Sequence, residues 1–332
     1  MAYTLARMTY ADTAVEAIGL TKAYGGTTVL DTVGLAVERG TVFALLGPNG
    51  AGKTTVVRIL ATLTAADGGT ARVAGFDVVR ARREVRRRIS LTGQFVAVDD
   101  GQTGRENLVM TARLSGLAAA AARRRADELL ERFDLVEAGA RRAGTYSGGM
   151  RRRLDLAAGL VADPEVIFLD EPTTGLDPRS RRETWRCVAE LAGSGTTVFL
   201  TTQYLEEADT LAGRIAVLDG GRIVAQGSAA ELKGRVGEQR IDLTLTDPAA
   251  FDAAVVRLGD RAARADRARL VVGVPTDGSA AHVRALLDDV DPGRDAVASF
   301  ALHAVTLDDA FLALTGRSGA GRTDDLLERD HA

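Results

Sequence analysis

Cysteine and histidine are scarce in this 332-residue sequence, which has one cysteine and three histidines. One cysteine cannot close an intramolecular disulfide or supply a cysteine-rich zinc site, so both a disulfide scaffold and zinc chemistry are excluded. We expect Cys187 to be an ordinary packed helix residue. The three histidines are His282, His303 and His331, and all lie beyond residue 235.

Long apolar runs are also absent. No stretch approaches the ~20 apolar residues that a membrane span needs, and the amino end, MAYTLARMTYADTAVEAIGL, lacks the apolar run of a secretory signal. We therefore expect a cytoplasmic protein, which could still dock onto a membrane protein. The 42 basic and 45 acidic residues leave a formal net charge of −3, which provides no global basic field for binding nucleic acid.

Lysine is nearly missing, because every basic residue except Lys22, Lys53 and Lys233 is an arginine. This bias, together with abundant alanine, glycine and valine, is typical of a GC-rich genome and carries no functional signal by itself. A lysine retained against this background is a candidate functional residue, and Lys53 lies inside a glycine-rich stretch.

The hydrophobic pattern predicts an α/β fold. Nearly continuous apolar runs indicate strands buried on both faces at residues 41–47, 166–172 and 196–202. Residues 80–160 have a mostly helical pattern, whereas residues 14–45 alternate around turns like short antiparallel strands. Strands that alternate with helices predict a mainly parallel core sheet, accompanied here by an antiparallel β subdomain and a helical subdomain.

The character of the sequence changes near residue 236. Segments such as RIDLTL, FDAAVVRLG and VASFALHAV alternate strand and helix patterns, which predicts a small carboxyl-terminal α+β unit. We therefore expect an amino-terminal extension (1–13), a large α/β domain (14–235), an accessory α+β domain (236–316) and a polar tail (317–332).

The stretch GPNGAGKTT, between a predicted strand and a predicted helix, fits the P-loop pattern G-x-x-x-x-G-K-[ST]. Backbone N–H groups of such a loop cradle phosphates, Lys53 can neutralise them, and the Thr54 hydroxyl can bind Mg²⁺. The residues predicted to bind the nucleotide here are Gly47, Pro48, Asn49, Gly50, Ala51, Gly52, Lys53, Thr54 and Thr55.

The segment VIFLDEP places Asp170 and Glu171 at the carboxyl end of a buried strand, where α/β sheets bind their ligands. We expect Asp170 to hold Mg²⁺ and Glu171 to polarise the attacking water. A helix-capping acidic pair is the alternative, and the P-loop elsewhere in the chain argues against it.

The stretch YSGGMRRRLDLA puts Ser147, Gly148 and Gly149 directly before a predicted helix. Flexible glycines and the unpaired N–H groups of a helix start together suit an anion. An ordinary joint between loop and helix, with Ser147 as the N-cap, is the alternative interpretation.

The P-loop, YSGGM, the acidic strand and TTGLDP occur in an order and spacing that resemble the ATP-binding cassette of ABC transporters, over residues 14–235. The resemblance implies a cassette that binds ATP and Mg²⁺ and works as a homodimer. In that family, the SGG turn of one protomer grips the γ-phosphate of ATP held by the other protomer's P-loop. The resemblance thus assigns Ser147, Gly148 and Gly149 to a site that needs two chains.

Further residues match the family's motifs individually. Gln94 in LTGQF resembles the Q-loop glutamine, which touches Mg²⁺ beside the surface that meets the membrane subunit. Tyr24 resembles the aromatic residue that stacks on adenine, with a plain core or turn tyrosine as the alternative. Asp177 in GLD resembles the loop that links the two ATP sites.

Three positions depart from the family's usual motifs. Tyr146 replaces the leucine that begins the signature, and Met150 replaces its final glutamine. Gln203, in TTQYLEEAD, occupies the switch position where a histidine is usual, and we assign it a catalytic role beside Glu171. Together with TLDDAFLALTGR near the carboxyl end, these features resemble ATP-binding subunits of the daunorubicin/doxorubicin-resistance type from actinobacteria.

The resemblance implies an ATPase on the inner face of the cell membrane, which powers export of drugs or lipophilic metabolites through a separate membrane-spanning permease subunit. A soluble ABC ATPase that acts on ribosomes or DNA is the alternative. It is disfavoured because the chain has one cassette, no heptad array and one cysteine, and we expect no nucleic-acid partner. A small-molecule kinase is disfavoured by the SGG signature.

Two segments keep open alternatives. The carboxyl unit is either a regulatory or partner-docking domain or a stabilising cap. The arginine run at residues 80–88 is interpreted as a solvated helix face, or else as a contact for a coupling helix or for anionic lipid headgroups.

Overall fold

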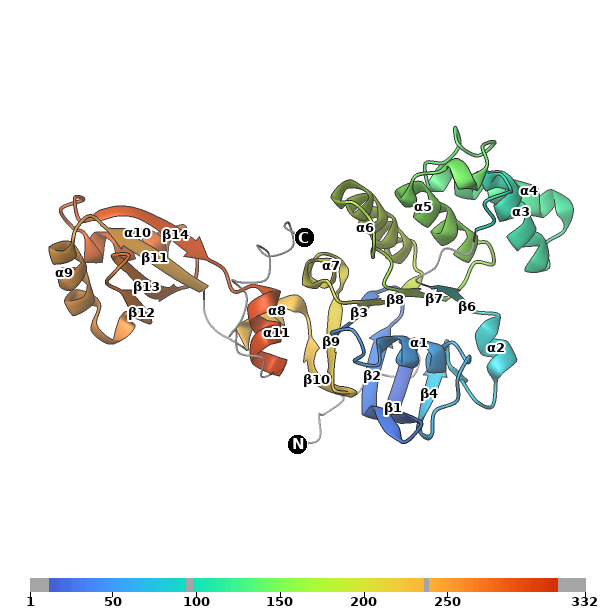
Figure 1. The fold of residues 1–332 in the computed structure, drawn as a ribbon, viewed down its shortest axis with the longest axis horizontal. Helices are drawn as coiled ribbons and strands as arrows, with labels where there is room; N and C mark the ends of the chain where they lie inside the picture. Colours follow the sequence, from blue (N-terminus) through green and yellow to red (C-terminus); the bar gives the residue numbers. More distant parts are fainter. Residues whose placement is uncertain (1–11, 94–97, 236–238, 316–332) are drawn as a thin grey trace, which may run out of the picture. The chain divides into compact units, whose positions relative to one another are not determined.

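The computed structural model describes residues 12–93, 98–235 and 239–315, and its internal contacts divide the chain into two units, Met1–Ala229 and Ala230–Ala332 (Figure 1). This division falls a few residues before the boundary predicted at 235/236. The predicted extension (1–13) and polar tail (317–332) lie almost entirely outside the described residues.

A six-stranded sheet of order β10-β9-β3-β8-β7-β6 forms the centre of the first unit. Its strands are β3 (Val42–Leu46), β6 (Ile89–Thr92), β7 (Val166–Asp170), β8 (Thr197–Thr202), β9 (Arg214–Asp219) and β10 (Arg222–Gly227). All neighbours pair in parallel except β9 and β10, which form a hairpin. Every residue of β3, β7 and β8 is buried, as expected for strands covered on both faces.

A second, antiparallel sheet has the order β2-β1-β4-β5. It contains β1 (Thr13–Tyr24), β2 (Thr27–Glu38), β4 (Gly68–Val73) and β5 (Phe76–Asp77). Buried residues of β1 and β2 share one core cluster with helix α1 (Lys53–Leu60) and with strand β3. The antiparallel subdomain thus packs on the element that carries Lys53.

The helical region contains α2 (Arg82–Arg86), α3 (Gly104–Leu114), α4 (Ala119–Arg132), the 3₁₀ turn η1 (Ala143–Thr145) and α5 (Gly148–Gly159). Helices α6 (Pro178–Gly193) and α7 (Leu205–Leu211) follow β7 and β8. The prediction of mostly helical structure for residues 80–160 is confirmed, but it missed the short strand β6. Cys187 is buried in α6, as predicted.

The arginine run forms helix α2 and its flanks. Arg80, Arg82 and Arg83 are exposed, which agrees with a solvated face. Arg86 and Arg88 also bond within the chain, to the Thr62 hydroxyl and to Glu84. The contact with a coupling helix or lipid headgroups stays a prediction.

The second unit begins with α8 (Ala229–Gly234) and has an antiparallel sheet of order β12-β13-β11-β14. Its elements are β11 (Gln239–Leu245), α9 (Pro248–Leu258), η2 (Gly259–Arg261), β12 (Arg264–Asp266), β13 (Val271–Thr276), α10 (Ala280–Val290), β14 (Val297–His303) and α11 (Leu307–Thr315). The β-α-β-β-α-β order is that of the ferredoxin-like fold. Apolar residues of the sheet, α9 and α10 form a separate core, which confirms the predicted α+β unit.

Across the described parts of the chain, no helix combines enough length with enough apolar character to span a membrane.

Candidate nucleotide-binding site

The P-loop connects the end of β3 at Leu46 to the start of α1 at Lys53. Gly52 has a φ of 104°, and a Cβ atom there would lie 2.7 Å from the Leu30 Cδ2 atom and 3.0 Å from the Val29 carbonyl oxygen. Both the left-handed backbone and the close approach of β2 therefore require glycine. The loop has its shape because the antiparallel sheet lies directly against it.

Lys53 is 4% exposed, and its ammonium group is surrounded by oxygen atoms. The Nζ atom donates to the carbonyl oxygens of Gly47 at 2.8 Å and Pro48 at 3.1 Å. It also lies 3.2 Å from the Glu171 Oε1 atom. The cation predicted to neutralise phosphates is thus paired with the carboxylate predicted to polarise water.

The acidic pair lies where β7 ends, beside the end of β8. The Asp170 carboxylate accepts a hydrogen bond of 2.5 Å from the Thr201 hydroxyl. The backbone N–H of Glu171 donates to both the carbonyl oxygen and the hydroxyl oxygen of Thr201, at 3.1 Å each. The Thr174 hydroxyl donates to Glu171 Oε2 at 3.2 Å, which fixes the far side of the carboxylate.

Glu171 has a φ of 50°, in the left-handed region that residues with a side chain rarely adopt. Such a conformation costs of order 1–3 kcal/mol and persists only where surrounding contacts enforce it. The hydrogen bonds from Glu171 to Thr201 supply this restraint. Backbone strain of this kind is concentrated at functional sites, and neither periodicity nor motif spacing could have revealed it.

A cavity of about 640 Å³ joins the predicted residues. Its lining residues are Val29, Asn49, Gly50, Gly52, Lys53, Thr54, Thr55, Glu171, Thr174 and Gln203. The structure therefore brings the P-loop, Glu171 and Gln203 to one place. Sequence reasoning missed Thr174, although it lies in the quoted TTGLDP motif, and Val29, which no motif marks.

Tyr24 is 47% exposed at the end of β1, and the Lys22 Nζ atom lies 5.2 Å from its ring centroid. In the described structure Tyr24 is not part of the cavity lining, so its stacking role stays a prediction. Gln94 lies outside the described residues. The preceding residue, Gly93, accepts a 2.9 Å hydrogen bond from the buried Arg152 side chain.

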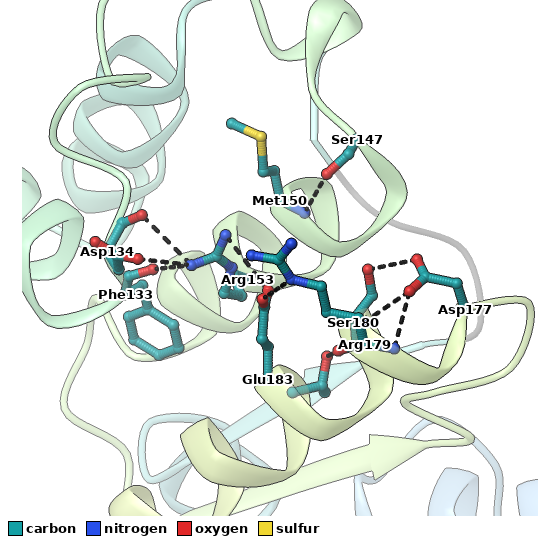
Figure 2. Close-up of polar contacts among 10 residues, drawn as sticks. Phe133, Asp134, Ser147, Met150, Arg153, Asp177, Arg179, Ser180 and Glu183 are labelled. Carbon is teal, nitrogen blue, oxygen red and sulfur yellow. Dashed lines mark hydrogen bonds and ion pairs between the residues drawn. The ribbon is translucent and has the colours of Figure 1, made fainter.

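Ser147 is the N-cap of α5, because its hydroxyl oxygen accepts from the Met150 N–H at 3.2 Å (Figure 2). Ser147 is thus an N-cap, whereas anion binding by the SGG turn stays a prediction. A Cβ atom on Gly149 would lie 2.5 Å from the Ser180 hydroxyl oxygen, so this glycine lets α5 approach α6. Tyr146, which departs from the family motif, is buried, and its hydroxyl donates to the Ala138 carbonyl at 2.6 Å.

Asp177 is the N-cap of α6 (Figure 2), and a Cβ atom on Gly148 at the start of α5 would lie 3.6 Å from the Cδ2 atom of the preceding residue, Leu176. Its carboxylate accepts from the Ser180 hydroxyl at 2.7 Å, the Arg179 N–H at 2.9 Å and the Ser180 N–H at 3.0 Å. The Ser180 hydroxyl and then the backbone donors hold the pKa of Asp177 below its usual value. Asp177 therefore stays ionised and fixes the loop before α6.

The donor atoms around the cavity suit Mg²⁺ better than a transition metal. Among the described residues, no group of three or more His, Cys, Asp or Glu side chains could hold a metal ion. Mg²⁺ needs no such group, because it binds through one or two carboxylates together with substrate phosphates and water. The Thr54 hydroxyl, in the cavity lining, and the Asp170 carboxylate, which lies next to Glu171 outside that lining, are oxygen donors of this kind.

A model of the ABC transporter family matches residues 30–174. The daunorubicin/doxorubicin resistance ATP-binding protein of Streptomyces peucetius is 49% identical over 325 residues, which cover 93% of this chain and 94% of that protein. The Nod factor export ATP-binding protein I of Paraburkholderia xenovorans is 37% identical over 307 residues, which cover 92% of this chain and 98% of that protein.

Solved structures give the same result. An ATP-binding subunit of an ABC transporter has a TM-score of 0.60 at 26% identity and covers 67% of this chain and 92% of its own. The cbiO1 protein of Clostridium perfringens, part of an ABC transporter complex, has a TM-score of 0.63 at 25% identity, with 67% and 91% covered. The chain therefore belongs to the ATP-binding proteins of ABC transporters, and it is of the daunorubicin/doxorubicin-resistance type.

Proposed function

We propose that this chain hydrolyses ATP to power export of drugs or lipophilic metabolites through a separate membrane-spanning partner, on the cytoplasmic face of the membrane. One observation carries the hydrolytic part of the proposal: a single cavity joins the P-loop lysine, the strand-end carboxylate of Glu171 and the amide of Gln203. Two similar proteins are named for daunorubicin/doxorubicin resistance and for Nod factor export, and these names support drugs or lipophilic metabolites as the exported class.

Lys53 and Glu171 have complementary tasks in this proposal. Phosphate oxygens would accept the hydrogen bonds of the Lys53 ammonium, which otherwise lies 3.2 Å from the Glu171 carboxylate. Glu171, still held by Thr174, then becomes available to accept a proton from the attacking water. Gln203 would donate a hydrogen bond to the γ-phosphate from the end of the neighbouring strand β8.

Mg²⁺ would neutralise charge that develops on the phosphate oxygens. Thr54, Asp170 and Gln94 are the residues that we propose hold it. The Asp170 carboxylate is oriented for such a task by its hydrogen bond from the Thr201 hydroxyl.

A second copy of the chain would complete the site. Ser147, Gly148 and Gly149 lie at the N-terminus of α5, where free N–H groups favour an anion. In the described structure they are not among the residues that line the cavity of their own chain. We therefore propose that they bind the γ-phosphate held by the partner protomer, and that Asp177 fixes the loop between the two sites.

The carboxyl unit is proposed to dock the membrane partner. Its last helix, α11, buries Leu307 and Ala310 but leaves Leu312 41% exposed. An apolar side chain left exposed on a short amphipathic helix suits a protein partner.

We expect Lys53→Ala to abolish ATPase activity. The change removes a cation that faces several phosphate charges, each close pair being worth up to ~4 kcal/mol at an effective dielectric constant near 20. Phosphate release measures the effect, and Lys233→Ala, which removes a lysine of the second unit, is the control. Hydrolysis by Lys53→Ala at the native rate would refute the P-loop assignment.

Glu171→Gln should keep ATP binding and stall hydrolysis, because the amide preserves shape but cannot orient and deprotonate water. The stalled protein should accumulate as an ATP-bound dimer, which light scattering detects. Glu190→Gln, a neutralised carboxylate on the exposed part of α6, serves as control. A Glu171→Gln protein that stays monomeric at saturating ATP contradicts the two-chain site.

Gln203→Ala should lower kcat at least about tenfold, roughly 1.4 kcal/mol of transition-state stabilisation, with little change in ATP affinity. Gln203→His should remain active and gain a pH dependence near the unperturbed histidine pKa of about 6.5. The two variants are compared on the same nucleotide, because phosphate ionises near pH 6. Native turnover in Gln203→Ala means that another residue senses the γ-phosphate.

Deleting residues 304–332, which removes α11 and keeps β14, should weaken copurification with the membrane partner and spare nucleotide binding. Leu312→Ser tests the same surface with one exposed residue and leaves the buried face of α11 intact. Unchanged copurification of both variants would favour the stabilising-cap interpretation of the carboxyl unit.

A further inference from the structure

Glu207 is a fully buried carboxylate on α7, the helix that begins just after Gln203. Its Oε1 atom accepts hydrogen bonds from the Thr173 hydroxyl at 2.9 Å and the Trp185 indole N–H at 3.0 Å. Its Oε2 atom is buried and has no hydrogen-bond partner among the described residues. Glu207 lies in the TTQYLEEAD stretch, but no role was predicted for it.

A contribution to folding stability does not explain why position 207 carries a carboxylate. Burial raises the pKa of Glu207, although the nearby Thr202 hydroxyl and the hydrogen bonds from Thr173 and Trp185 oppose the rise. The positive charges of Arg181 and Arg152 act on the carboxylate, but no direct ion pair joins either to it in the described structure. Incompletely satisfied buried charges are costly, and apolar replacements are often more stable. A role in the chemistry explains why a carboxylate is kept here.

The position of Glu207 connects both proposed catalytic segments. Thr173 follows Glu171 by two residues, just beyond β7, whereas Glu207 follows Gln203 by four residues, beyond β8. These strands are neighbours, with Asp170 opposite Thr201. The hydrogen bond from Thr173 to Glu207 is therefore a side-chain link between the segment that carries Glu171 and the helix that follows Gln203.

We propose that Glu207 is a positioning residue: through the Thr173 hydroxyl it fixes Glu171 and Gln203 at a set separation across the γ-phosphate. The inference rests on the proposed ATP hydrolysis. The Thr173 hydroxyl is buried, and its hydrogen bond to Glu207, at 2.9 Å, is the shorter of the two that Oε1 accepts. The indole N–H of Trp185 donates to the same Oε1 atom from α6.

The two donors to Glu207 allow a matched test. Thr173→Val keeps the shape of the side chain and removes only the donor on the catalytic segment, whereas Trp185→Phe removes only the donor on α6. We expect Thr173→Val to lower kcat about tenfold with the KM for ATP changed less than about twofold. Trp185→Phe should lower the melting temperature and leave kcat within about twofold of native. A purely structural Glu207 would make both variants lose stability and kcat in parallel.

Substitutions at Glu207 itself complete the experiment. Glu207→Gln retains an oxygen that can accept from both donors, so its kcat should stay near native. Glu207→Leu should lose kcat as Thr173→Val does, and adding Thr173→Val should then cause no further loss. Native kcat in Thr173→Val overturns the inference even if Glu207→Leu fails to fold. ATPase activity that survives Lys53→Ala would instead overturn the proposed function, so the two failures are distinguishable.

Discussion

The parallel pairing of β3, β7 and β8 is the constraint on which the site depends. Backbone register sets Leu46 opposite Thr202 and Asp170 opposite Thr201, so the P-loop, Glu171 and Gln203 leave the sheet at one edge. Because successive side chains of a strand point to opposite faces, a one-residue slip of β7 would turn Asp170 away from the Thr201 hydroxyl. Apolar side chains enforce the register, since every residue of these strands is buried. The geometry of the polar groups is thus set by the apolar ones.

The polar groups themselves do little for stability. A buried ion pair such as Lys53–Glu171 repays its desolvation cost only in part. Glu171 adds the cost of a left-handed backbone, and Glu207 adds a buried oxygen without a partner among the described residues. These costs fall on Lys53 and Glu171 in the cavity lining and on the helix that follows Gln203, whereas the core of the antiparallel sheet is apolar. That concentration is the mark of a site preorganised for charge, because residues held ready for phosphates and water cannot also be optimal for a dry interior.

The sequence could predict the gathering of Lys53, Glu171 and Gln203, because motif order and the strand-end rule need no tertiary detail. It could not predict the φ of Glu171, which depends on hydrogen bonds to Thr201, or the link from Thr173 to Glu207. These contacts join segments about thirty residues apart with no periodicity of their own. Strand β6 was missed for a similar reason: its four residues are too short to show alternation, and pairing with β7 defines it as a strand.

Helix α6 contacts both the segments of the proposed dimer interface and the helix that follows the proposed catalytic residue Gln203. Its first turn is capped by Asp177 and packs Ser180 against Gly149 of α5, and Arg153 on α5 lies 3.8 Å from Glu183 on α6 (Figure 2). Farther along the same helix, the Trp185 indole donates to Glu207. If Ser147 bound a phosphate held by a partner protomer, the contact would act on α5 and on α6, which packs against it. Helix α6 in turn contacts the Glu207 carboxylate through Trp185. Because packed helices shift as units rather than deform continuously, the contact between Trp185 and Glu207 would connect the proposed dimer interface to the segment that carries Glu171.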